Sequence, residues 1–182
     1  MSKKSGAIAE LIEQFQGREL DAHYLGYFEC FNRRLYFEAH DVLEELWLAQ
    51  RHGANYSFYK GLIQLAGAFV HLQKNRLRPA AALFKMADAN LEKYPVMHER
   101  LDVGKVRGLI RKWLGDLEKT GFEMNPLGPS NKPELKLESR RAASRSGDAN
   151  ADGFCRVRRK NVLISSENCR NEREMGSSKK NG

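Results

Sequence analysis

The chain has 182 residues, of which 41% are hydrophobic and 30% are charged, and its net charge is +8. This length fits one domain plus an additional segment. Three cysteines without a CxxC pair exclude a disulfide framework, and the lack of about 18 consecutive apolar residues excludes a membrane span. Because no apolar stretch typical of a signal peptide follows the first residues, we expect a soluble cytoplasmic protein.

Apolar residues at helical spacing predict a succession of helices before residue 123. We expect no strand in this part of the chain. Two aspartates are expected to cap helices, Pro79 suits the first turn of a helix, and Gly121 suits a helix end. The expected helices cover residues 6–16, a segment after Asp21, residues 35–50, residues 56–74, a segment from Pro79 to about Tyr94, and a segment from Asp102 to Gly121.

The predicted helix over residues 56–74 is apolar around most of its circumference, so we expect it at the centre of the domain. Trp47 and Trp113 lie on apolar faces of their helices and are expected to be buried. The expected fold class is therefore all-α: a compact bundle of five to six helices over residues 5–122, large enough to fold alone.

Residues 123–182 have a different composition from the predicted bundle. Large apolar residues are sparse, prolines gather after Met124, and most of the net positive charge lies here. We therefore expect a disordered basic tail. Within it, a short basic run could contact the phosphates of a nucleic acid, and its residues are Arg156, Arg158, Arg159 and Lys160. The remaining chain is nearly neutral, so the overall charge does not indicate a nucleic-acid-binding domain.

The predicted helix over residues 35–50 carries a dense polar cluster. On a helical wheel its carboxylates Glu38, Asp41 and Glu45 group on the side away from the apolar face, which is typical of a solvated charged stripe. His40 and Glu44 instead lie one turn apart at the edge of the apolar face. An imidazole and a carboxylate at this spacing can hydrogen-bond or share a divalent metal ion.

The central helix has a polar stripe of its own, formed by Lys60, Gln64, Gly67 and His71. Consecutive helices joined by a short loop usually pack antiparallel, so we expect a polar site between the two helices. One interpretation is a hydrogen-bond network that fixes the helix register. The other interpretation is a site for a divalent metal ion. The sequence contains no motif for any other cofactor. The candidate site residues are His40, Glu44, Gln64 and His71, with His40, Glu44 and His71 as metal ligands.

Two motifs carry a resemblance to a known family. Residues 31–47 read FNRRLYFEAHDVLEELW, and residues 58–66 read FYKGLIQLA, followed by His71 and Leu72. Over residues 22–94 the chain resembles the domain-of-unknown-function 309 family, with Asp41 where that family usually has Glu. The resemblance implies a compact multi-helical domain from bacteria or archaea, and it implies no established activity.

Three functional hypotheses follow from the sequence. The leading one is a non-enzymatic binding or scaffold module with a polar cluster between two helices. The alternatives are a metal-assisted hydrolase or related enzyme that uses His40, Glu44 and His71, and nucleic-acid association through the basic tail. The sequence leaves open whether the protein is an enzyme and whether it forms a homo-oligomer, and it indicates no membrane contact.

Overall fold

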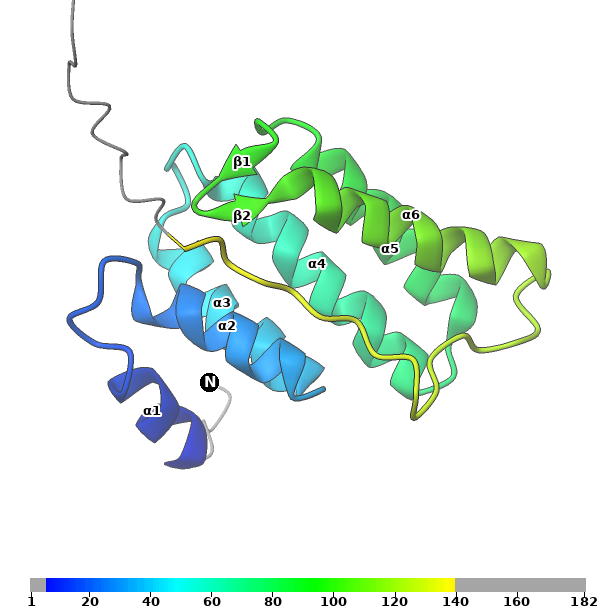
Figure 1. The fold of residues 1–182 in the computed structure, drawn as a ribbon, viewed down its shortest axis with the longest axis horizontal. Helices are drawn as coiled ribbons and strands as arrows, with labels where there is room; N and C mark the ends of the chain where they lie inside the picture. Colours follow the sequence, from blue (N-terminus) through cyan, green and yellow to red (C-terminus); the bar gives the residue numbers. More distant parts are fainter. Residues whose placement is uncertain (1–5, 140–182) are drawn as a thin grey trace, which may run out of the picture. The chain divides into compact units, whose positions relative to one another are not determined.

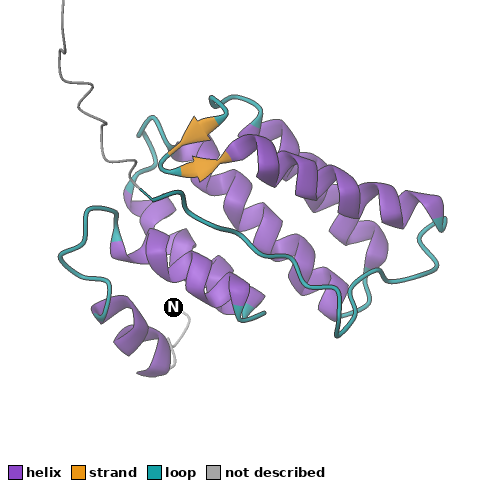
Figure 2. Ribbon diagram, in the orientation of Figure 1, coloured by secondary structure: helices purple, strands orange, loops and turns teal. Residues whose placement is uncertain are grey.

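The computed structural model describes residues 6–139. Within this range the chain forms six packed α-helices and one short antiparallel hairpin (Figures 1 and 2). The elements are α1 (Gly6–Glu13), α2 (Ala22–Asn32), α3 (Tyr36–Ala49), α4 (Tyr56–Gln73), α5 (Leu77–Leu91), β1 (Met97–His98), β2 (Leu101–Asp102) and α6 (Val103–Lys119). The expected all-α bundle is confirmed.

Local side-chain chemistry explains where the helices begin and end. Asp21 caps α2 by accepting hydrogen bonds from the backbone N–H groups of His23 and Tyr24, as expected from the sequence. Asp102 caps α6 by accepting from the N–H of Lys105. Gly121 follows α6 with a φ of 61°, the left-handed conformation that commonly ends a helix.

Helix α4 occupies the centre of the bundle, between α3 on one side and α5 on the other (Figure 1). Its Phe69 is fully buried and contacts aromatic rings from the four other long helices: Phe31 of α2, Tyr36 of α3, Phe84 of α5 and Trp113 of α6. Edge-to-face and offset ring contacts of this kind stabilise beyond simple area burial. The sequence expectation of a central fourth helix is confirmed.

The hairpin of β1 and β2 corrects the expectation that no strand precedes residue 123. Met97 pairs with Asp102, and His98 pairs with Leu101. The two turn residues, Glu99 and Arg100, have φ values of 46° and 61°, as a two-residue turn between twisted strands requires. Strands of two residues are too short for an alternating pattern, which is why the sequence does not reveal them.

An extended segment after α6, residues 125–139 and here called the strap, packs on the bundle. In Figure 1 it is the yellow segment that crosses over α4 and returns to the hairpin. Leu135 is 4% exposed, and Leu137 pairs with Leu101 in a β-bridge. Here the structure differs from the sequence expectation that the tail begins at residue 123, because the strap is anchored by hydrogen bonds to distant side chains. Residues 140–182 lie outside the described residues.

Candidate functional site

Polar side chains gather near the middle of α3. Nitrogen or oxygen atoms of His40, Asp41 and Glu44 that could bind a metal all lie within 4.8 Å of one another, and each residue is partly buried. His40 Nδ1 lies 3.1 Å from Asp41 Oδ1, which is hydrogen-bond distance. One imidazole and two carboxylates are therefore brought together by a single helix.

Gly67 of α4 lies opposite His40. A Cβ atom at Gly67 would lie 4.0 Å from His40 Cδ2 and 3.3 Å from Leu83 Cδ1. The contact with Leu83 of α5 would be tight, whereas the contact with His40 of α3 would be an ordinary van der Waals contact. The His40 imidazole therefore lies beside α4 at Gly67.

Asp41 is the member of this cluster that sequence reasoning missed as a site residue. On the helical wheel it belongs to the solvated stripe with Glu38 and Glu45. In the structure its side chain is only 23% exposed and bonds to His40, its neighbour in the chain. This hydrogen bond depends on the side-chain conformations, which a wheel built from Cα positions does not contain.

Gln64, expected at the polar site between α3 and α4, forms its hydrogen bond with α5 instead. It is 8% exposed, and its Oε1 accepts a hydrogen bond of 2.8 Å from Asn90 Nδ2 of α5. The amide thus joins α4 to α5, and it has no hydrogen bond to His40 or Glu44 among the described residues.

His71 lies one helical turn beyond Gly67 on α4. Its Nδ1 is buried and has no hydrogen-bond partner within residues 6–139. Burial lowers the pKa of His71 below its ordinary value of 6.5, and the nearby cations of Arg76 and Lys74 lower it further, so the imidazole is neutral at pH 7. His71 is not a member of the group formed by His40, Asp41 and Glu44, and its convergence with His40 stays a prediction.

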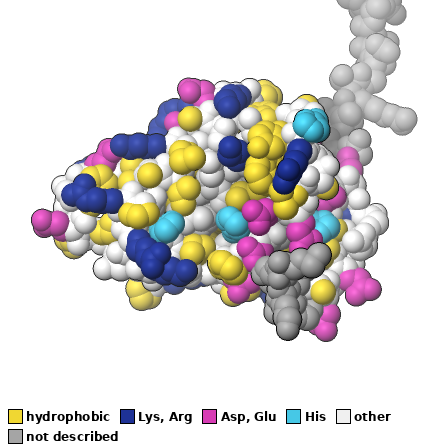
Figure 3. Space-filling model, turned by 180° about the vertical axis from the view of Figure 1, so that it is seen from behind, with side chains coloured by type: hydrophobic (Ala, Val, Ile, Leu, Met, Phe, Trp, Pro, Cys, Tyr) yellow, Lys and Arg dark blue, Asp and Glu magenta, His cyan; other side chains and the backbone are white. Residues whose placement is uncertain are grey.

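Figure 3 shows the face of the molecule opposite to that seen in Figure 1. Histidine side chains are visible on this face, with acidic side chains gathered beside some and basic side chains beside others. His40 has two carboxylates beside it, whereas the cations of Arg76 and Lys74 lower the pKa of His71.

Trp47 is the next large side chain along α3. Its ring centroid lies 5.2 Å from that of Tyr56, and Lys60 Nζ lies 5.9 Å from the centroid of the same tyrosine. Trp47 is only partly buried, unlike the expectation, whereas Trp113 is 1% exposed. The Nε1 of Trp47 is buried without a hydrogen-bond partner among the described residues.

A second polar cluster, at the hairpin, was not expected from the sequence. His98 Nε2 lies 2.8 Å from Asn55 Oδ1, and Asn55 Nδ2 donates to Glu99 Oε1 at 2.8 Å. Tyr24 donates from its hydroxyl to the backbone carbonyl of Glu99. These bonds hold the hairpin against α2 and the start of α4. His98 is partly buried.

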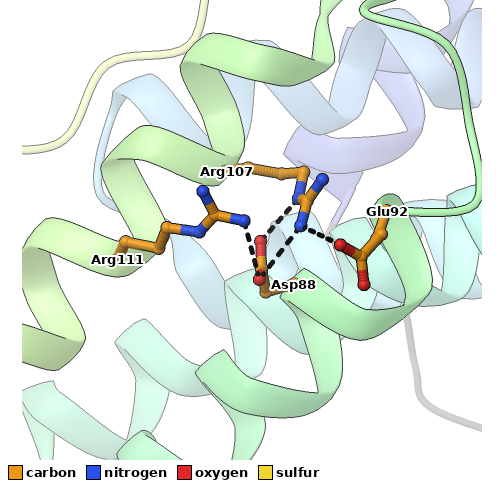
Figure 4. Close-up of polar contacts among 4 residues, drawn as sticks. All are labelled: Asp88, Glu92, Arg107 and Arg111. Carbon is orange, nitrogen blue, oxygen red and sulfur yellow. Dashed lines mark hydrogen bonds and ion pairs between the residues drawn. The ribbon is translucent and has the colours of Figure 1, made fainter.

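Ion pairs between α5 and α6 form a third polar cluster, shown in Figure 4. Arg107 Nε donates to Asp88 Oδ1 at 2.7 Å, and Arg107 Nη2 donates to Glu92 Oε1 at 2.8 Å. Arg111 Nη2 lies 3.5 Å from Asp88 Oδ2. Burial raises the pKa of Asp88, but the two arginines outweigh it and hold this pKa below its ordinary value. These ion pairs connect α5 to α6.

The candidate nucleic-acid contacts of the tail lie outside the described residues. They are Arg156, Arg158, Arg159 and Lys160.

The fold and the α3–α4 surface define an all-helical domain with histidines and carboxylates beside its central helix. Residues 24–83 match the family described as "Domain of unknown function (DUF309)", and the chain therefore contains a DUF309 domain. The matched range includes all of α3 and α4. The chain has no significant match among curated proteins or among solved structures.

Among the described helices, none is sufficiently long and apolar to cross a membrane.

Proposed function

We propose that the DUF309 domain is a non-enzymatic binding module and that its binding element is a divalent metal ion held by His40, Asp41 and Glu44. The observation that carries the proposal is the convergence of their potential ligand atoms within 4.8 Å. An ion about 2.1 Å from each ligand atom requires distances of at most about 4.2 Å between them. Small side-chain rotations therefore suffice to close the site.

Electrostatics supports the same proposal. Asp41 and Glu44 are three residues apart on one helix, a spacing at which like charges repel each other. Glu44 has no hydrogen bond or ion pair with any residue in the described part of the chain. A cation between the two carboxylates would relieve this repulsion. Imidazole nitrogen with carboxylate oxygen suits transition metals such as Zn²⁺ or Mn²⁺.

All three ligands come from one helix, so water or a partner's side chain would complete the coordination from the solvent side. A metal held in this way is suited to bridging the domain to a ligand that supplies further oxygen or nitrogen atoms.

Calorimetric titration of the purified protein with Zn²⁺ and with Mn²⁺ tests the proposal. We expect one site of high affinity in the wild type, and an affinity reduced by more than about tenfold in His40→Ala and in Glu44→Gln. His52→Ala and Glu123→Gln are matched controls, because both residues are exposed and lie outside α3. Equal binding by His40→Ala and His52→Ala would refute the site.

A metal-assisted hydrolase is the second candidate, favoured by the neutral imidazole of His71 with its unpartnered Nδ1. A neutral imidazole near a metal-bound water could act as a general base. In this case His71→Ala would retain metal binding but lose turnover of simple phosphate or carboxylate esters. A wild-type protein that binds metal and turns over none of these esters would favour the binding module.

A further inference from the structure

The strap contacts the bundle as an added strand contacts a sheet. Asn32 Nδ2 donates to the carbonyl of Leu135 at 2.8 Å, and the N–H of Leu135 donates to Asn32 Oδ1 at 2.9 Å. Two residues further on, Leu137 forms the bridge with Leu101 of β2. The N–H of Glu138 then donates to the carbonyl of Arg100 at 2.8 Å. On the side of the strap all of these contacts use backbone atoms, so any extended chain in the same register could make them.

The surface under the strap is apolar and needs an occupant. Leu135 is 4% exposed and belongs to the main core, and Leu101 and Val106 beneath it are 1% and 2% exposed. A cavity of about 290 Å³ remains between the strap and α6, lined in part by Leu109. Removing the strap would expose these side chains to water, which costs free energy in proportion to the apolar area.

The connection between α6 and the strap is short and strained. It spans residues 120–124, and within it Gly121 and Phe122 both have positive φ, 61° and 64°. The left-handed conformation suits glycine but is unfavourable for a residue with a Cβ atom such as Phe122. If the chain extended through this connection, Phe122 would leave the left-handed region and the strap would move away from its own bundle.

We propose that the strap exchanges between two copies of this chain, with residues 120–124 as the hinge. In the exchanged dimer the strap of each copy lies on the Asn32–Leu101 surface of the other. Every strap contact is reproduced between copies, so the apolar surface is never left open. Only the hinge and the entropy of association differ between the two forms, as is typical of domain swapping. Monomer and dimer are therefore in equilibrium, and the dimer is favoured by a high protein concentration during refolding.

Disulfide trapping between two different chains tests the exchange directly. One full-length chain carries Leu101→Cys and the other carries Leu137→Cys, both in a background with Cys155→Ser and Cys169→Ser, and one has an affinity tag. The chains are mixed, unfolded, refolded at high concentration and oxidised. Paired residues on adjacent strands lie at a separation that a disulfide can bridge. We expect a disulfide-linked heterodimer. Val96→Cys, at an exposed position, replaces Leu101→Cys in the control mixture.

A second measurement isolates the hinge. Phe122→Gly and Phe122→Ala both remove the ring, but only glycine tolerates the left-handed conformation. The Gly variant should therefore favour the monomer over the Ala variant by about tenfold for each hinge in the dimer, as measured by light scattering after size-exclusion chromatography. The proposal is overturned if the wild type refolds only as a monomer. It is equally overturned if a dimer forms in which the cysteines at 101 and 137 do not link between chains.

Discussion

At the scale of single residues, the pairing of buried polar atoms decides which side chains are structural. Gln64 is almost fully buried, and its Oε1 is satisfied by Asn90. A buried acceptor that loses its donor costs more free energy than the hydrogen bond itself contributes. Gln64 therefore supports the fold through its paired oxygen. Glu44, in contrast, has no partner in the described residues.

The Gln64–Asn90 pair gives a first prediction. Asn90→Leu leaves Gln64 Oε1 unpaired and should lower the free energy of unfolding by about 1–3 kcal/mol in urea titrations. The double variant Gln64→Leu with Asn90→Leu removes both polar groups and should lose less. A double variant that is less stable than Asn90→Leu would contradict a purely structural role for Gln64.

His71 gives a prediction about pH. Because its pKa is lowered in the folded state, mainly by burial, protonation favours the unfolded chain. Its stability contribution is present above the unfolded pKa of about 6.5 and is lost as pH falls below that value. The wild type should therefore lose more unfolding free energy between pH 7 and pH 5 than His71→Gln does. Parallel losses in the two proteins would show that His71 is not held neutral by the fold.

At the scale of secondary-structure elements, ion pairs join α5 to α6. The lowered pKa of Asp88 affects stability in the same direction as that of His71, but in a more acidic pH range. Its contribution is present above the ordinary pKa of 3.8 and is lost as pH falls through the lower folded value. Asp88→Asn should cost about 1–2 kcal/mol at pH 7, because the pair with Arg107 is only partly exposed. The difference from wild type should shrink toward pH 2, which thermal unfolding at several pH values can measure.

The strap gives the second prediction at this scale. Leu135→Ala should lower the free energy of unfolding by about 2–4 kcal/mol, because Leu135 is buried in the main core. The neighbouring Glu134 is exposed, so Glu134→Ala should change stability by less than about 0.5 kcal/mol. Equal effects of the two substitutions would mean that the strap is not part of the packed core in solution.

The comparison between sequence and structure is also clearest at the scale of elements. Asp21, Asp102 and Gly121 mark helix ends through local chemistry, and the structure confirms each of them. The strap and the hairpin were not predicted, because their contacts join residues far apart in the chain. Asn32 and Leu135 are an example: they are separated by 103 positions, and no local pattern relates them.

The candidate site was predicted in part for the same reason. Helical spacing brings His40 and Glu44 to one flank of α3, which a wheel can show. A helical wheel does not show that Asp41 forms a hydrogen bond with His40, or that Gln64 Oε1 accepts a hydrogen bond from Asn90. Both outcomes depend on side-chain hydrogen bonds rather than on helical periodicity.

At the scale of the whole molecule, one helix connects the core to the candidate site. The inner side of α4 carries Phe69, around which four other helices pack, while Gly67 of the same helix lies against His40. His40, one of the candidate ligands, therefore lies beside the central helix of the bundle. Rigid support of this kind keeps metal ligands close to their bound positions and reduces the entropy lost on binding.

The central claim is that His40, Asp41 and Glu44 hold a divalent metal ion. Anomalous diffraction from crystals of the full chain grown with Zn²⁺ tests it most directly. The account predicts an anomalous peak about 2.0–2.2 Å from a nitrogen of His40 and from carboxylate oxygens of Asp41 and Glu44, and no such peak in crystals of Glu44→Gln. A peak elsewhere on the molecule, or a wild-type crystal in which these three side chains carry no metal at saturating Zn²⁺, would contradict it.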